Sequence, residues 1–172
     1  MNRRTSIQLS VFYFQKFALL FLVDIVIEYV SGGSIRVLLD KFNKLDEPIV
    51  ASYTRQILNG LHYLHFNGIV HRDIKGSNVL IDASGKIKLT DFGASKRMDK
   101  MGDDGQPPQA FRGSPYWTAP EVMMKKSQGK PSDIWSVGCV VIEMLTGLPP
   151  WANLGKNSEE IIQLIISGSR FF

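Results

Sequence analysis

The segment that most restricts the possible folds of this chain is "SDIWSVGCVVIEMLTG", residues 132–147. Apolar residues would lie on nearly every side of a helix formed by this segment. We therefore expect a central helix that other elements cover. Ser132 is its expected N-cap and Gly147 its expected end. At 172 residues the chain is long enough for one domain with a core around such a helix.

Three further segments have helical patterns. Ile35–Phe42 is a short amphipathic candidate with Ser34 as its N-cap. Residues 47–68 carry apolar side chains at spacings of three to four, which predicts a longer helix. Its core positions are expected to be Ile49, Tyr53, Ile57, Leu61 and Leu64. Residues 157–166 are expected to form a last helix.

Between these helices the apolar period changes to that of strands. "NVLIDASGKIKLTD", residues 78–91, predicts two short strands around a turn at 82–85. Folding about this turn would bring Asn78 level with Asp91, and two oxygen ligands at one edge suit Mg²⁺. Asp73 lies one loop away. Taken singly, each of these residues is more often a turn residue than a catalyst.

Composition and charge narrow the function classes. The net charge of +4 comes from basic pairs scattered along the chain, which disfavours a nucleic-acid surface. Cys139, the only cysteine, lies in an apolar run, so it is expected to be buried in a protein of the reducing cytoplasm. Residues 1–23 begin basic and turn apolar, but Lys16 and Asp24 interrupt them. Buried strands are favoured there over membrane insertion.

Several motifs in order carry a family resemblance. An Asp five residues before an Asn in "HRDIKGSN" is followed by "DFG" and by "GSPYWTAPEV". From Asp24 onward the chain resembles eukaryotic serine/threonine protein kinases, above all the mitogen-activated protein kinase kinase kinases. The resemblance implies an α+β fold, a protein-kinase-like C-lobe that is mainly α-helical with a small catalytic hairpin. The N-lobe would be largely missing.

The same resemblance divides the chain into three parts. Residues 1–23 would be an atypical apolar leader, with a residual N-lobe strand left open as its identity. Residues 24–168 would be a partial kinase domain with the hinge and most of the C-lobe, and 169–172 a tail.

The resemblance also implies roles in the catalytic loop, with ATP and Mg²⁺ as cofactors. Asp73 would accept or orient the proton of the substrate hydroxyl. Lys75 would steady the γ-phosphate. Asn78 and Asp91 would hold Mg²⁺ on the ATP phosphates.

The hinge "IEYVSGG" implies an adenine site. Ile27 would be the gatekeeper, and the backbones of Glu28 and Val30 would bond adenine. Leu80 would form the floor under the base, and Ser34 would lie near the ribose.

Five further residues receive roles in the activation and substrate segment. Arg72 would bind an activation-loop phosphate, and Gly93 would let the loop swing. The hydroxyl of Ser114 would touch the catalytic Asp and Lys. Glu121 would need an arginine from a missing part, so we expect it to be unpaired here. Asp133 would brace the catalytic loop through backbone N–H groups.

Other residues depart from the family pattern or carry a simpler role. No G-x-G-x-x-G and no V-A-I-K lysine precede the hinge, and no Ser, Thr or Tyr lies between Ser95 and Ser114. Asp103 and Asp104 either replace a phosphate with fixed charge or are solvated loop acids. His71 is expected to be a packed structural histidine. We also expect a weak nucleotide site and a poorly stable product.

Three functions stay open at this point. The first is a kinase of the kinase-kinase-kinase type that phosphorylates a protein substrate, a downstream kinase among the candidates. The second is a non-catalytic, pseudokinase-like binding fragment. The third is a membrane-tethered fragment that uses residues 7–23. The sequence does not predict an oligomeric state.

Overall fold

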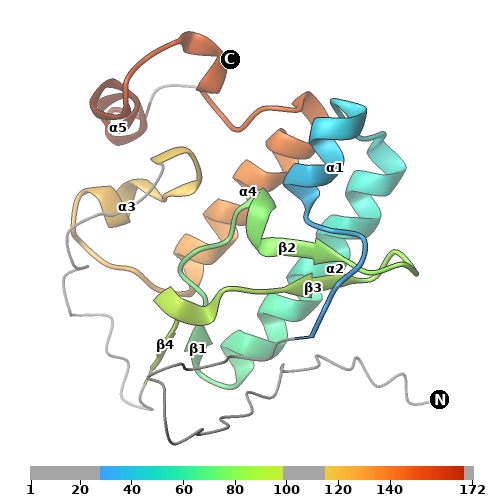
Figure 1. Cartoon of the computed structure of the whole chain (residues 1–172). Helices are drawn as coiled ribbons and strands as arrows, with labels where there is room; N and C mark the ends of the chain where they lie inside the picture. The colour runs from blue at the N-terminus through green and yellow to red at the C-terminus, as the bar shows by residue number, and fades with distance from the viewer. Residues whose placement is uncertain (1–27, 99–114, 169–172) are drawn as a thin grey trace, which may run out of the picture.

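The computed structural model describes residues 28–98 and 115–168, which are mainly helical with two small antiparallel sheets (Figure 1). The α-helices are α1 (Ile35–Phe42), α2 (Glu47–Phe66), α3 (Pro120–Met123), α4 (Lys130–Thr146) and α5 (Ser158–Ile166). The strands are β1 (Ile69–Val70), β2 (Val79–Ile81), β3 (Ile87–Leu89) and β4 (Lys96–Arg97). Four 3₁₀ turns complete the fold: η1 (Gly76–Asn78), η2 (Phe92–Ala94), η3 (Pro115–Trp117) and η4 (Ala152–Leu154).

Helix α4 lies in the middle of this arrangement, with α1 and α2 on one side and α3 and α5 on the other (Figure 1). Its side chains Val137, Val140 and Met144 are buried in the main hydrophobic cluster, together with residues of α1, α2 and β2. The central position confirms the prediction from the sequence. Burial all round is not observed, because Ile134 is 49% and Leu145 40% exposed in the described structure.

The start of α4 differs from the prediction. The N-cap is Gly129, and Ser132 is the third residue of the helix. Pro131 explains the earlier start, because proline lacks an N–H and fits the first helical turn. The Ser132 hydroxyl accepts a hydrogen bond from the Gly129 N–H at 3.4 Å. The end is as predicted: Gly147 has a φ of 84°, a conformation that favours glycine.

The other predicted helices are confirmed with small changes. The Ser34 hydroxyl caps α1 by accepting from the Val37 N–H, and Asn157 caps α5. In α2, Ile57, Leu61 and Leu64 are buried as expected. Ile49 is wrong as a core position, since it is 42% exposed and Val50 takes the buried place beside it.

The predicted hairpin is present, and a second strand pair accompanies it. Strands β2 and β3 pair antiparallel, with Val79 opposite Leu89. The carboxylate of Asp82 holds the turn by accepting from the N–H groups of Ser84 and Lys86. Strands β1 and β4 also pair antiparallel, which no pattern in the sequence predicted. The segment 71–78 follows β1 and precedes β2 in the chain, so each of its ends is attached to one of the two strand pairs.

A smaller apolar cluster joins α5 to the segment before α4. Trp151, Ile161 and Ile165 are buried there, and Trp135 packs against them. Trp117 packs against the main cluster instead. The three tryptophans are thus core or core-lining residues, as predicted.

Cys139 is buried as predicted, and burial raises the pKa of its thiol to about 12. Among the described helices, none is both long and apolar enough to cross a membrane. Several predictions fall on residues outside the described ranges: the strands expected within 1–23, the gatekeeper Ile27, the acids Asp103 and Asp104, and Ser114.

Candidate active site

Three charged or polar side chains of the loop between β1 and β2 meet at one carboxylate oxygen. Lys75 Nζ donates to Asp73 Oδ2 at 2.8 Å, and Asn78 Nδ2 donates to the same oxygen at 2.8 Å. Asn78 Nδ2 also donates to the backbone carbonyl of Asp73 at 2.8 Å. The Asp73 and Lys75 side chains stay about one-third exposed, at 33% and 32%. The structure therefore brings together the three residues predicted to be catalytic.

His71 is a fully buried residue behind this loop. Its ring bonds the Thr90 carbonyl through Nε2 at 3.0 Å, and its Nδ1 accepts from the Asp73 N–H at 3.3 Å. A ring that accepts at Nδ1 and donates at Nε2 is the neutral tautomer. Burial lowers the pKa of His71 below 6.5, which agrees with that assignment. His71 is a packed structural residue, as expected.

Asp133, near the start of α4, holds the backbone of the same loop. Its Oδ2 accepts from the His71 N–H at 2.9 Å and its Oδ1 from the Arg72 N–H at 2.8 Å. This is the kind of contact expected for it. Arg72 has a φ of 70°, a costly conformation for a residue with a side chain. The bond to Asp133 fixes the backbone at that residue.

His65 joins this contact, and the sequence analysis did not foresee it. Its Nε2 lies 2.8 Å from Asp133 Oδ2, and Asp133 is 1% exposed. The buried carboxylate thus has donors from α2 and from two backbone groups of the loop. A histidine in the last turn of α2 was visible in the sequence, but its partner lies 68 residues away.

Asn78 and Asp91, the two residues predicted to hold Mg²⁺, lie at the open end of the β2–β3 hairpin. The strand register places Thr90 opposite Asn78, and the Thr90 N–H bonds the Asn78 carbonyl at 3.0 Å. Asp91 therefore lies one residue beyond the predicted level, because the turn pairs Asp82 with Lys86.

The chemistry of this pair suits Mg²⁺. Because Asn78 Nδ2 makes both bonds to Asp73, the amide oxygen is directed away from Asp73. The Asp91 carboxylate is exposed at the end of β3. Amide and carboxylate oxygens are preferred ligands of Mg²⁺, which also keeps waters and phosphate oxygens in its shell. Within 28–98 and 115–168, no group of three or more His, Cys, Asp and Glu forms a metal cluster.

The hinge segment lies beside β2. Ser34 forms a β-bridge with Leu80, and the Ile81 N–H bonds the Gly33 carbonyl at 2.8 Å. Gly32 permits this approach, because a Cβ there would lie 2.2 Å from the Ile81 carbonyl oxygen. Leu80, predicted as the adenine floor, is thus next to the hinge.

The other hinge residues make contacts of their own. The Glu28 side chain pairs with Lys88 of β3, and the Val30 carbonyl accepts from the Gly33 N–H at 3.4 Å. The Ser34 hydroxyl is used to cap α1. Adenine and ribose contacts at these residues stay predictions.

The structure describes the surroundings of two further residues of the activation and substrate segment, Gly93 and Glu121. The left-handed conformation in "DFG" belongs to Asp91, with a φ of 62°, while Gly93 lies in the 3₁₀ turn η2. At this motif it is therefore Asp91, and not the glycine, that has a positive φ in this structure. Glu121 is not left without a donor: the Ser132 hydroxyl bonds its Oε1 at 3.1 Å. This hydroxyl is a neutral donor, so the expected absence of an arginine partner stays a prediction.

Glu143 is a second buried carboxylate that the sequence analysis passed over. It is 0% exposed and accepts hydrogen bonds from the Gly76 N–H and the Trp117 indole N–H. The signal was a single acid inside the apolar run "VVIEML". Burial raises the pKa of Glu143.

Comparison with known proteins agrees with this geometry. The family model described as "Protein kinase domain" matches residues 8–169. Over 130 residues, 76% of this chain, the sequence is 52% identical to "Mitogen-activated protein kinase kinase kinase 3" of Arabidopsis thaliana. The human protein of the same name is 50% identical over 130 residues, and "Mitogen-activated protein kinase kinase kinase A" of Dictyostelium discoideum 46% over 147.

The chain is much shorter than these relatives. The matched segment covers 20% of the Arabidopsis protein, 21% of the human protein and 15% of the Dictyostelium protein. The family match itself extends over most of the present chain. The chain therefore belongs to the protein kinase family, and its sequence is close to those of the mitogen-activated protein kinase kinase kinases.

Proposed function

We propose that this chain carries the catalytic loop of a serine/threonine protein kinase that transfers the γ-phosphate of ATP to a protein hydroxyl. The observation that carries the proposal is the meeting of Lys75 and Asn78 on Asp73 Oδ2, both at 2.8 Å. Membership of the protein kinase family supports the same reaction.

The roles follow from this arrangement. With Oδ2 occupied by two donors, Asp73 Oδ1 is the oxygen left to orient the substrate hydroxyl and take its proton. That oxygen of the substrate then forms a bond to the γ-phosphorus, while the bond to the bridging oxygen of ADP breaks. The Lys75 ammonium, beside Asp73, is placed to stabilise charge on the transferred phosphoryl group.

The cofactor residues fit the same reaction. Asn78 and Asp91 would hold Mg²⁺, which neutralises phosphate charge when it is bound. The backbones of Glu28 and Val30 would bind adenine, with Leu80 below the base and Ser34 near the ribose. The β-bridge between Ser34 and Leu80 supports one continuous nucleotide site along this edge.

The finer assignments extend the proposal. Residues 24–168 would form the hinge and most of a kinase C-lobe, acting in a mitogen-activated protein kinase cascade in the cytoplasm. The substrate would be a protein, with a downstream kinase as the candidate that the relatives' names suggest. Arg72 would bind an activation-segment anion, and Ser114 would touch Asp73 and Lys75.

A chimaera tests the catalytic part. Residues 28–168 would replace the matching segment in the catalytic domain of the human relative, and transfer of labelled phosphate to a protein substrate would be measured. We expect transfer, and a loss of about 100-fold or more in Asp73→Asn, since a positioned base typically contributes at least that much. Asp46→Asn is the matched control, because Asp46 makes no side-chain capping bond and directly precedes α2, whose other end leads into β1 and the loop.

Two outcomes would contradict the proposal. One is a folded chimaera that binds ATP but transfers nothing, which would favour the non-catalytic binding fragment. The other is equal transfer by the Asp73→Asn variant. For the 172-residue chain alone we expect weak binding of ATP and Mg²⁺ in a thermal-shift assay, because residues 1–27 contain neither the glycine-rich motif nor the strand lysine.

A further inference from the structure

The β2–β3 hairpin has two outer edges, and a different part of the chain bonds to each of them (Figure 1). On the β2 side, the Ile81 N–H bonds the Gly33 carbonyl of the hinge at 2.8 Å. On the β3 side, the Ile87 N–H bonds the side-chain oxygen of Gln56 in α2 at 3.0 Å. A hairpin of two strands is only marginally stable alone, so these outer contacts fix its place in the fold.

Gln56 bonds to β3 as one further peptide unit would. Its amide oxygen accepts from the Ile87 N–H, and its amide nitrogen donates to the Gly85 carbonyl at 3.4 Å. Gly60 lies four residues further along the same face of α2, and a Cβ there would lie 3.2 Å from Cδ1 of Leu89. Helix α2 therefore holds β3 at both ends of the strand, with little room for it to move.

The two outer contacts meet at one position of the hairpin, because Ile81 and Ile87 are opposite each other in the strand register. Both of their N–H groups point outward, so they form a non-hydrogen-bonded pair, in which the side chains lie closer together. Ile81 is buried in the main hydrophobic cluster, and Ile87 packs against it. Close-packed side chains transmit a displacement, since no free volume absorbs it. A shift at Gln56 should therefore reach Ile81.

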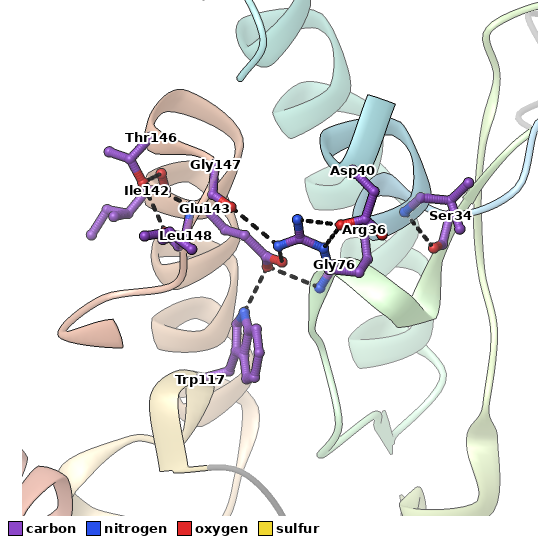
Figure 2. A network of polar contacts seen from close by, with 11 residues as sticks. Ser34, Arg36, Asp40, Gly76, Trp117, Ile142, Glu143, Thr146, Gly147 and Leu148 are labelled. Atoms are coloured by element: carbon purple, nitrogen blue, oxygen red, sulfur yellow. Dashed lines mark hydrogen bonds and ion pairs between the residues drawn. The ribbon is translucent and has the colours of Figure 1, made fainter. Parts of the chain in front are cut away.

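The hinge in turn follows Ile81 closely. A Cβ at Gly32 would lie 2.2 Å from the Ile81 carbonyl oxygen, and the Gly33 carbonyl holds the N–H of the same residue. Ser34 then forms the β-bridge with Leu80, and its hydroxyl caps α1 (Figure 2). The end of the hinge is thus attached to β2 and to α1, so its backbone has to follow the position of β2.

We propose that Gln56 is a positioning residue for the nucleotide site, which acts on the hinge through the pair Ile87 and Ile81. Its two hydrogen bonds go to Gly85 and Ile87, not to the residues predicted to bind adenine. The effect on ATP binding rests on the proposed function, whereas the coupling between Gln56 and Ile81 is a property of the folded chain.

Hydrogen exchange, read by NMR on the complete 172-residue chain, tests the coupling. Gln56→Met removes the acceptor and keeps a side chain of similar length. Exchange at the Ile87 amide should become about 5-fold faster, as expected for the loss of one neutral hydrogen bond. The Ile81 amide should also exchange faster, by about 2-fold or more, whereas a purely local role of Gln56 would change Ile87 alone. Gln56→Glu keeps an acceptor for Ile87, so it should preserve the protection of Ile81.

The reverse experiment starts from the hinge. Gly32→Ala places a methyl group against the Ile81 carbonyl and should push the hinge away from β2. Because coupling between two sites is reciprocal, the Ile87 amide, which bonds Gln56, should then exchange faster as well. This arm needs no Gln56 variant, so it decides even if Gln56→Met does not fold.

The control separates this coupling from a general loosening of α2. Asn59→Leu also replaces an amide side chain of α2 by an apolar one, at an exposed position, so neither amide should change. Two results would overturn the proposal: an Ile81 amide that ignores Gln56→Met, or an Ile87 amide that ignores Gly32→Ala.

A kinetic arm keeps the proposed function apart from this inference. In the chimaera described above, Gln56→Met should raise KM for ATP by about 2- to 5-fold, the range for one neutral hydrogen bond, and leave kcat nearly unchanged. The reason for the split is that residues 73–78 are untouched. If the parent chimaera transfers no phosphate, the proposed function fails and the exchange data still decide the coupling. If it transfers phosphate, an unchanged KM refutes the role in the nucleotide site, and negative exchange data refute the coupling alone.

Discussion

Replacing Asp133 by Asn would test how much of the loop's conformation depends on one buried charge. The carboxylate accepts two backbone N–H bonds, at 2.9 Å from His71 and 2.8 Å from Arg72, and lies 2.8 Å from His65. An amide has one acceptor oxygen, and its best orientation keeps the His71 and His65 bonds. The Arg72 N–H then loses its partner and faces the new amide nitrogen.

The magnitude follows from that single lost bond. A hydrogen bond to a charged group contributes about 1.5–3 kcal/mol, and a buried donor left unpaired costs about 1–3 kcal/mol. Both ranges describe the same lost hydrogen bond, so they are not added together. We therefore expect the free energy of unfolding to fall by about 2–3 kcal/mol. Arg72, with its φ of 70°, should also relax toward an ordinary conformation.

Urea unfolding and amide hydrogen exchange measure the two effects. The unfolding free energy should fall, and the Arg72 amide should lose more protection than the His71 amide. Asp46→Asn is the control, because Asp46 is exposed and makes no side-chain capping bond, so stability should not change. A loss below about 0.5 kcal/mol with the Arg72 amide still protected would refute the reasoning, since that is the usual range of neutral surface changes.

Four other changes have clear expected results. Gly76→Ala should destabilise the chain by about 1–3 kcal/mol in urea unfolding, because the new methyl overlaps the buried α4 carboxylate. Gly138→Ala, with open space at its Cβ, should instead stabilise by about 0.5–1 kcal/mol, and equal effects would contradict this. Since burial lowers the His71 pKa, the folded state takes up a proton less readily than the unfolded state. Stability should therefore fall as the pH drops below 6.5, and His71→Gln should reduce that dependence when wild type and variant are unfolded at about pH 7.5 and about pH 5.5. His65→Phe should cost about 1 kcal/mol alone and less in the Asp133→Asn background, because the bond that His65 keeps there goes to a neutral amide oxygen and not to a charged carboxylate; strict additivity would argue against it.

Features that depend on neighbouring residues were readable from the sequence. The caps Ser34 and Asn157, the end at Gly147 and the hairpin turn at Asp82 all rest on contacts within a few residues. The apolar run of α4 also identified the central helix correctly. Where a local rule failed, another local feature was the cause: Pro131 moved the start of α4 ahead of Ser132.

Contacts over long sequence separations needed the structure. His65 lies 68 residues before Asp133, and Gly76 lies 67 residues before Glu143. In each pair the sequence shows a polar residue near apolar neighbours, but it does not show which distant residue is the partner. The same holds for the β1–β4 pair and for the exposed side of α4, because neither follows from local periodicity.

The sequence by itself determined the longer helices, the β2–β3 hairpin and the family, because helix periods, caps, turns and the spaced motifs around Asp73 all lie within short stretches of the chain. The family resemblance predicted that Asp133 braces this loop, but only the tertiary structure added the contacts of Glu143 and His65. Two buried carboxylates of α4, Asp133 and Glu143, bind the loop backbone at Arg72 and Gly76. The physical reason is that a buried charge requires donors, and folding brings those donors from distant parts of the chain.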